Sequence, residues 1–418
     1  MSIHKFIISL FILIFIGLFS ACSVSKQHTD QVISNDVDYF SGLLVYDPIN
    51  HDTLIDINSD KYFTPASTTK LFTLYTALKT LGDSIATFNF YESNDSLYLE
   101  PLADPSFLYE TLPNLSFDFI KSKQKPIALL FTENFTDFIY GSGWQWDDFQ
   151  YYFMPEKSVF PLYGNLVNIK NGKISPYYFQ PQLTAVKDAD FNRDFYTNNF
   201  TYLKNDTVTL KVPYKTSLDL SASLLADTLN LPVHIISQIK YKLNPLVSTP
   251  TLPIYKRLMD KSDNFIAEQV LLIVARKYSG FYSVSDAIDW SLTNLYSDIP
   301  QRPRWEDGSG LSRYNLFTPQ SMVYLLEKYL TDYGFEFIKD IFPSNTENNA
   351  LKQWYPFETT YMYAKTGTLS NNHNICGYLI TKKGRLLIFS YMNNHFIQDI
   401  DEIRKTMNEN LINIYNSY

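Results

Sequence analysis

An amphipathic helix follows the stretch Phe63-Thr64-Pro65-Ala66-Ser67-Thr68-Thr69-Lys70. The apolar residues after Pro65 recur with helical spacing, at Leu71, Leu74, Tyr75, Leu78 and Leu81. Gly82 is suited to end such a helix. Ser67 is therefore expected in the first turn, and Lys70 is expected on the same face one turn later.

A serine hydroxyl next to a lysine amine can act as a nucleophile, with the amine as its base. The hydroxyl is a poor nucleophile unless a base lies within hydrogen-bond reach, and a neutral lysine amine can serve as that base. Burial and a second cation nearby both lower a lysine pKa toward the neutral form. The spacing alone identifies nothing, because Ser-x-x-Lys occurs four times, at Ser23/Lys26, Ser67/Lys70, Ser122/Lys125 and Ser237/Lys240.

Two further motifs select one of these four pairs. Lys365-Thr366-Gly367-Thr368 contains the only Lys-Thr-Gly of the chain and precedes a predicted strand, where a glycine lets the backbone approach a ligand closely. Ser262-Asp263-Asn264 opens a helical stretch. Ser-x-x-Lys, Ser-Asp-Asn and Lys-Thr-Gly, in this order, form the motif set of serine β-lactamases and penicillin-binding proteins. The order therefore favours Ser67 and Lys70.

The flanking segments predict an α+β layer architecture. Residues 43–46 and 54–57 form one predicted hairpin, and residues 375–380 and 386–391 form a second. Helical patterns cover residues 253–276, 287–295 and 319–329, and a long amphipathic helix is expected over residues 397–414. Between about residues 87 and 243, short alternating segments with many Asn, Asp and Pro predict a mainly β insertion.

The motifs and their surroundings resemble those of a known family. The matching segments are residues 63–70, Lys261 to Asn264 with Ala267-Glu268-Gln269, Asp307 to Arg313, Ala364 to Leu369, and Gly377-Tyr378. Together they resemble the D-alanyl-D-alanine carboxypeptidase/endopeptidase family of class C low-molecular-mass penicillin-binding proteins. The resemblance implies a transpeptidase-like catalytic domain of residues 38–86 and 244–418. The large insertion that the family carries would be residues 87–243.

The resemblance also implies a role for each site residue. Ser67 would attack the D-Ala-D-Ala peptide bond, and Lys70 would take its proton. Ser262 and Lys365 would pass a proton to the leaving amine, and Asn264 would position Lys70. The backbone N–H groups of Ser67 and Thr368 would form the oxyanion hole, and the hydroxyls of Thr366 and Thr368 would hold the terminal carboxylate beside Lys365. Gly367 belongs to the same substrate-binding and oxyanion segment, and Arg313 could meet the stem peptide. The implied partners are a peptidoglycan stem peptide ending in D-Ala-D-Ala and β-lactam antibiotics as inhibitors.

The N-terminus predicts export. Residues 1–5 are short and cationic, Phe6 to Phe19 are almost wholly apolar, and Ser20-Ala21-Cys22 are small, which is the pattern of a signal peptide covering residues 1–21. A retained spanning helix is the alternative. Phe19 to Cys22 resemble a bacterial lipoprotein cleavage box, so that Cys22 would carry lipid and residues 22–37 would tether a periplasmic protein to a membrane. Cys376, in an apolar run, is expected to be a buried hydrophobe without a disulfide.

Composition excludes several classes of function. The net charge is −8, with dispersed basic residues, which argues against a nucleic-acid partner. The six histidines lack metal-ligand spacing, so no metal or cofactor is expected, and His373 is expected in a loop. Two alternatives stay open. One is a β-lactamase or esterase of the same fold, and the other is a silent lipoprotein that binds peptidoglycan.

Overall fold

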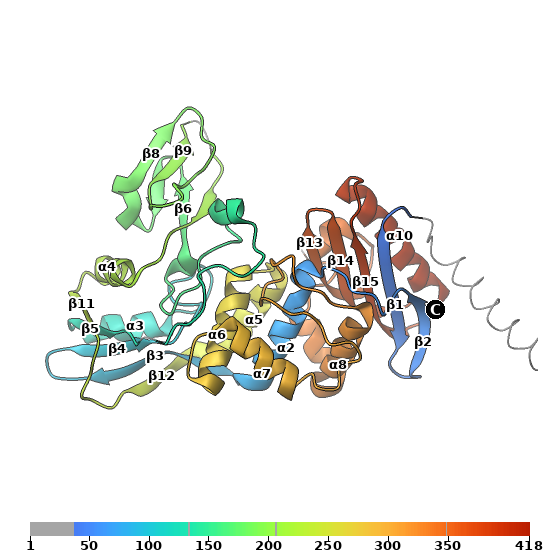
Figure 1. Ribbon diagram of the computed structural model, residues 1–418, viewed down its shortest axis with the longest axis horizontal. Helices are drawn as coiled ribbons and strands as arrows, with labels where there is room; N and C mark the ends of the chain where they lie inside the picture. Colours follow the sequence, from blue (N-terminus) through green and yellow to red (C-terminus); the bar gives the residue numbers. More distant parts are fainter. Residues whose placement is uncertain (1–36, 133, 205–206, 348) are drawn as a thin grey trace, which may run out of the picture.

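The computed structural model describes residues 37–418 except residues 133, 205–206 and 348 (Figure 1). The predicted signal peptide, Cys22 and the tether before Val37 lie outside the described residues. Within the part of the chain that the structure describes, no helix is long and apolar enough to cross a membrane.

A five-stranded antiparallel sheet organises the catalytic part of the molecule. Its strand order is β13-β14-β15-β1-β2, which pairs β1, the first strand of the described residues, with β15, the last. Both predicted hairpins are confirmed. The additional strand β13 carries the Lys-Thr-Gly motif at one edge of the sheet. The bounds are β1 (Phe40–Asp47), β2 (Asp52–Ile57), β13 (Met362–Leu369), β14 (Asn372–Ile380) and β15 (Leu386–Asn394).

Helices cover both faces of this sheet, because successive side chains on a strand point to opposite sides. On β1, Leu43 and Val45 pack toward α10 (Ile400–Ser417) and α9 (Ala350–Trp354), while Leu44 packs toward the other helices. Figure 1 shows α10 on one side of the sheet and α2 and α8 on the other. The central strands are therefore buried on both faces.

The helices on the second face form the middle of the molecule. They are α2 (Lys70–Thr80), α5 (Thr251–Asp260), α6 (Asn264–Ser279), α7 (Val284–Asn294) and α8 (Pro319–Ile341). The prediction of one helical stretch over residues 253–276 is wrong in one respect, because the chain breaks between α5 and α6. Ser262 stands in this break with a φ of 53°, a left-handed conformation that a continuous helix excludes.

The inserted region is defined here as residues 84–250, from the start of β3 to the end of β12; the boundaries at residues 87 and 243 stay a prediction. It contains a five-stranded sheet, β11-β5-β4-β3-β12, a three-stranded sheet, β10-β6-β7, and a parallel pair, β8-β9. The two helices α3 and α4 pack with these sheets around a core of their own (Figure 1). The bounds are β3 (Ser84–Glu92), β4 (Leu97–Pro101), α3 (Leu115–Lys123), β5 (Ile127–Leu130), β6 (Leu166–Lys170), β7 (Lys173–Ser175), β8 (Leu183–Val186), β9 (Phe200–Leu203), β10 (Leu210–Pro213), α4 (Leu218–Leu229), β11 (Val233–Ile236) and β12 (Asn244–Pro250).

Candidate active site

Ser67 lies in a short 3-10 turn, η1 (Ala66–Thr69), that leads directly into α2. Ala66 has a φ of 50°, and non-glycine residues adopt this strained conformation mainly where the surrounding structure enforces it. The hydroxyl groups of Thr68 and Thr69 fix the turn by donating to the carbonyls of Pro65 and Ala66, both at 2.8 Å. The nucleophile candidate is thus held by a rigid turn at the helix start.

Lys70 is completely buried, and its amine reaches three acceptors. Nζ lies 2.9 Å from Ser67 Oγ, 2.6 Å from Asn264 Oδ1 and 2.6 Å from the carbonyl oxygen of Ser309. Burial lowers the pKa of Lys70 from 10.5 to about 8, against the opposing charges of carboxylates nearby. A measurable fraction of this amine is therefore neutral near neutral pH.

Ser262 and Lys365 form a second polar pair across the same site. Lys365, on β13, donates from Nζ to Ser262 Oγ at 2.9 Å and to the Thr366 carbonyl at 2.8 Å. Burial lowers the pKa of Lys365 well below its usual value, and the charge of Lys70 lowers it further. Two buried lysines, one of which lowers the pKa of the other, thus each contact a serine hydroxyl.

Gly367 permits β13 to lie against the nucleophile turn. A Cβ at this position would lie 2.6 Å from the Pro65 carbonyl oxygen, 2.7 Å from the Ser67 nitrogen and 2.8 Å from the Thr68 nitrogen. Contacts this short do not occur with real side chains. The glycine of the Lys-Thr-Gly motif is therefore explained by close packing of two backbones.

The hydroxyl of Thr368 contacts the ring of a buried histidine, His373. This hydroxyl lies 2.7 Å from His373 Nδ1, and His373 Nε2 lies 2.8 Å from the Tyr355 hydroxyl. The prediction of His373 as a loop residue is wrong, because it lies on β14 directly opposite Thr368. Burial lowers the pKa of His373 to about 3, so its ring is neutral near neutral pH. The signal that could have found it is the two-residue turn Ser370-Asn371, which fixes this pairing.

The carboxylate of Glu268 supports the amine of Lys70 through the backbone of Ser309. Glu268, on α6, accepts from the backbone nitrogens of Gly308 at 3.2 Å and Ser309 at 2.8 Å. The carbonyl of the same Ser309 accepts from Lys70 Nζ. Burial, together with the charge of Asp307, raises the pKa of Glu268 to about 7. The sequence reading assigned Glu268 no role, although it follows Asn264 by one helical turn and so shares its face.

Asp307 and Asp263 are a turn residue and a helix-cap residue. Asp307 accepts from the backbone nitrogens of Gly310 and Ser312 and from Trp144 Nε1 at 2.8 Å. Asp263 caps α6 by accepting from the Ile266 nitrogen at 3.1 Å. Both carboxylates therefore hold loops around the site.

The structure brings together Ser67, Lys70, Ser262, Asn264 and Lys365, which come from three distant segments. The competing pairs at Ser122 and Ser237 lie in the inserted region, and Lys125 forms an ion pair with Glu92 at 2.8 Å. The Ser23 pair lies outside the described residues. The structural arrangement agrees with the choice of Ser67 and Lys70.

Four of these side chains, those of Ser67, Ser262, Asn264 and Lys365, line a cleft of about 1080 Å³ between the catalytic part and the inserted region, and Lys70 is buried behind Ser67. Thr366, Thr368 and Arg313 also line the cleft, and the exposed Arg313 donates to the Ser370 carbonyl at 3.5 Å. Among the described residues, no group of three His, Cys, Asp or Glu side chains could hold a metal ion. Cys376 is buried and free, as predicted.

Two solved structures share the fold of this chain. Penicillin-binding protein 4 (DacB) of Haemophilus influenzae has 21% identity and a TM-score of 0.75, covering 93% of this chain and 98% of its own. A predatory peptidoglycan endopeptidase of Bdellovibrio bacteriovorus, Bd3459, has 16% identity and a TM-score of 0.54, covering 91% and 94%. The fold is thus that of the penicillin-binding proteins, and the predicted α+β class is confirmed.

The sequence comparisons add the family. The D-alanyl-D-alanine carboxypeptidase DacB of Haemophilus influenzae is 27% identical over 187 residues, which cover 41% of this chain and 38% of that protein. The profile of the D-Ala-D-Ala carboxypeptidase 3 (S13) family matches residues 24–175 and 234–414. The chain belongs to the D-Ala-D-Ala carboxypeptidase 3 (S13) family. The resemblance identified from the motifs is therefore confirmed.

Proposed function

We propose that this protein hydrolyses the terminal D-alanyl-D-alanine bond of peptidoglycan stem peptides through a covalent ester on Ser67. The observation that carries the proposal is the 2.9 Å contact between Ser67 Oγ and the amine of Lys70, whose buried position lowers its pKa to about 8. A nucleophile and a base with a suitable pKa are the two requirements for acylation near neutral pH.

Acylation proceeds in two steps, attack by Ser67 and departure of D-alanine. Neutral Lys70 takes the proton of Ser67 as Oγ attacks the carbonyl carbon, and the carbonyl oxygen becomes an oxyanion. The backbone N–H groups of Ser67 and Thr368 donate to that oxygen, which is where preorganised donors contribute most. Ser262 then gives its proton to the departing amine of D-alanine and recovers one through Lys365. The C–N bond breaks, and the ester on Ser67 remains.

Deacylation returns the enzyme to its starting state. Water attacks the ester carbonyl and gives a proton to neutral Lys365, and Ser67 Oγ leaves as it takes back the proton held by Lys70. A β-lactam follows the same first step, but its leaving amine stays attached to the acyl group, so the adduct persists. Penicillin-binding protein 4 of Haemophilus influenzae has been solved with a β-lactam bound. This supports β-lactams as ligands of the present chain.

The terminal carboxylate of the peptide is assigned to Lys365, Thr366 and Thr368, with Arg313 at the rim of the cleft. The amine of Lys365 is buried, and its pKa is well below the usual value in the empty site. An arriving carboxylate opposes both causes of that shift, because it supplies a negative charge beside the amine. Substrate binding therefore restores the cation that recognises it.

Cleavage of peptide cross-bridges is a second candidate activity at the same site. The cleft continues past Ser67 to Leu166, Thr209 and Lys211 of the inserted region, so it has room for a second peptide. The endopeptidase of Bdellovibrio bacteriovorus shares the fold. A muropeptide dimer that is cut to monomers by the wild type, but not by Ser67→Ala, would establish this activity.

We further propose that the protein acts in the periplasm as a lipoprotein anchored through Cys22. The support is the cationic, apolar and small-residue order of residues 1–22. Mass spectrometry of the mature N-terminus tests this proposal. A lipidated Cys22 is expected, and a first residue other than Cys22 would contradict it.

Labelling with a fluorescent penicillin tests the main proposal. The wild type should form a long-lived adduct and release D-alanine from a peptide ending in D-Ala-D-Ala, and Ser67→Ala should do neither. Ser122→Ala, at another Ser-x-x-Lys spacing, is the matched control and should behave as the wild type. Rapid release of hydrolysed penicillin would favour a β-lactamase instead. Binding of peptidoglycan without labelling or D-alanine release would favour the silent lipoprotein.

A further inference from the structure

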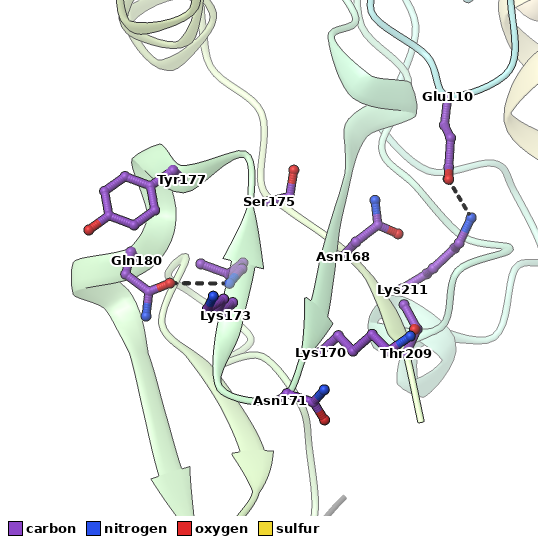
Figure 2. A pocket seen from close by; sticks show the side chains of 11 residues that line it. Glu110, Asn168, Lys170, Asn171, Lys173, Ser175, Tyr177, Gln180, Thr209 and Lys211 are labelled. Carbon is purple, nitrogen blue, oxygen red and sulfur yellow. Dashed lines mark hydrogen bonds and ion pairs between the residues drawn. The ribbon is translucent and has the colours of Figure 1, made fainter. Parts of the chain in front are cut away.

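The inserted region holds a second cavity, of about 980 Å³, beside the catalytic cleft (Figure 2). Its wall is formed largely by one face of the three-stranded sheet β10-β6-β7. Glu110, Thr209 and Lys211 line both the cavity and the cleft. The cavity therefore extends the surface that a long substrate would meet after it leaves the catalytic residues.

The two faces of strand β6 differ in polarity. On β6, Val167 and Ile169 are buried in the core of the inserted region, whereas Asn168 and Lys170 line the cavity. In register across the sheet, Asn168 lies between Ser175 of β7 and Lys211 of β10. The cavity wall consequently carries a row of polar side chains on a sheet, as a binding surface requires, and Ile174 and Tyr177 add apolar area to it.

Lys170 and Lys173 form the end of this surface away from the catalytic cleft. They are direct cross-strand partners in the hairpin of β6 and β7, a position in which like charges destabilise a sheet. Neither amine forms an ion pair with any residue that the structure describes. Three lysines and one glutamate line the cavity, although the whole chain has a net charge of −8. Two unpaired cations held side by side fit an anionic ligand.

We propose that this cavity binds a second acidic stem peptide while a first stem peptide of the same polymer occupies the catalytic cleft. The carboxylates of the second peptide meet Lys170 and Lys173. The inference rests on the proposed function, since a D-Ala-D-Ala stem ends in a carboxylate and a polymer presents many such stems. Lys170 follows Leu166, which lines the cleft, by four strand residues, or about 13 Å. A neighbouring branch of a polymer can span that distance, whereas an isolated peptide of three residues, at most about 11 Å long, cannot.

The test compares a short and a polymeric substrate with the variant Lys170→Ala/Lys173→Ala. Removal of a like-charge cross-strand pair should not destabilise the hairpin, and an unchanged rate of penicillin acylation will show that the catalytic part is intact. D-Alanine release from the short peptide should equal that of the wild type. The polymeric substrate is purified peptidoglycan from which attached phosphate polymers have been removed. On this substrate the variant should need about 3 to 10 times more peptidoglycan for half-maximal rate, as expected for two exposed ion pairs.

Lys187→Ala/Lys242→Ala is the matched control, because it removes the same charge from exposed positions of the inserted region that do not line the cavity. This control should keep wild-type values on both substrates. Equal losses of activity on peptidoglycan in the two double variants would overturn the inference, since the net charge of the inserted region, and not the position of the lysines, would then explain the losses. No loss in either would overturn it as well. A wild type inactive on both substrates would instead contradict the proposed function itself.

Amidation of the free carboxylates on the same peptidoglycan identifies the group that binds. A Ser67→Ala background prevents turnover and permits binding to be measured by co-sedimentation. Amidated peptidoglycan should bind two proteins equally well: Ser67→Ala alone, and Ser67→Ala combined with Lys170→Ala/Lys173→Ala. If amidation leaves the difference between the two proteins unchanged, the lysines recognise something other than a carboxylate, and the proposed ligand is wrong.

Discussion

Lys70 Nζ lies 2.6 Å from Asn264 Oδ1 and thereby joins the first turn of α2 to the first residue of α6. The two residues are 194 positions apart in the sequence. Asn264 is fixed in turn by its own amide nitrogen, which donates to the Phe153 carbonyl at 2.8 Å. The orientation of the base thus depends on the packing of two helices and on a loop of the inserted region.

The rate of penicillin acylation should rise with pH and level off above about 8. Burial lowers the pKa of Lys70 to about 8, and only the neutral amine can accept the Ser67 proton. Well below that pH, the rate should fall roughly tenfold for each pH unit. Stopped-flow labelling from about pH 6 to about pH 9 measures the profile. A rate independent of pH over this interval would exclude Lys70 as the base.

Glu268→Gln should shift this profile toward lower pH. The charge of ionised Glu268 raises the pKa of Lys70, and the amide removes that charge while keeping an acceptor for the Ser309 nitrogen. Lys70 will then lose its proton more readily, and acylation between about pH 7, where Glu268 ionises, and the wild-type midpoint should be faster by about 3-fold or more. The same pH series measures the shift.

The control for this shift is Glu327→Gln, a carboxylate on α8 that contacts Tyr46 rather than the site. Its profile should coincide with that of the wild type. A Glu268→Gln profile displaced toward higher pH would contradict the electrostatic argument. A uniform loss at every pH would indicate that Glu268 only supports the loop of Gly308 and Ser309.

The outer elements of the catalytic part could be predicted because their sequences carry clear periodicity. The hairpin residues 375–380 and 386–391 alternate or run apolar, and the C-terminal helix repeats every three or four residues. Strand β13 was not predicted, because its polar residues Lys365, Thr366 and Thr368 interrupt any apolar pattern. Its strand conformation is set by pairing with β14, which is a tertiary interaction.

The side chains of the candidate site could be predicted as a group, but the residues that contact them from behind could not. Motif order indicated that Ser67, Ser262 and Lys365 act together, whatever the path of the chain between them. Glu268 and His373 act through Ser309 and Thr368, which they contact only after the helices and strands have packed. Short-range sequence patterns hold no information about such contacts. The break at Ser262 likewise depends on where α5 and α6 pack.

Gly367→Ala should reduce acylation by about 100-fold or more. The added Cβ would meet the nitrogen of Ser67 at 2.7 Å, so β13 must move away from the nucleophile turn, and the proposed oxyanion donors separate. Gly384→Ala is the control, because its φ of 82° strains an alanine while no atom lies within 4 Å. Both variants should lose about 1 kcal/mol of stability. Labelling rates and urea unfolding separate the two effects, and an active Gly367→Ala enzyme would contradict the proposed donor geometry.

His373 should make the stability of the protein fall as the pH drops from about 6.5 toward about 3. Burial lowers its pKa to about 3 in the folded state, whereas the unfolded chain takes up the proton near 6.5. The stability that the neutral ring contributes is therefore present above about pH 6.5, and up to a few kcal/mol of it is lost as the unfolded state becomes protonated.

His373→Gln should be less stable near pH 7, because the bonds to Thr368 and Tyr355 change, yet its unfolding free energy should depend less on pH. The exposed His234→Gln should retain the wild-type dependence. Urea unfolding at a series of pH values gives the slopes, and equal slopes for the wild type and His373→Gln would show that His373 does not titrate in this way.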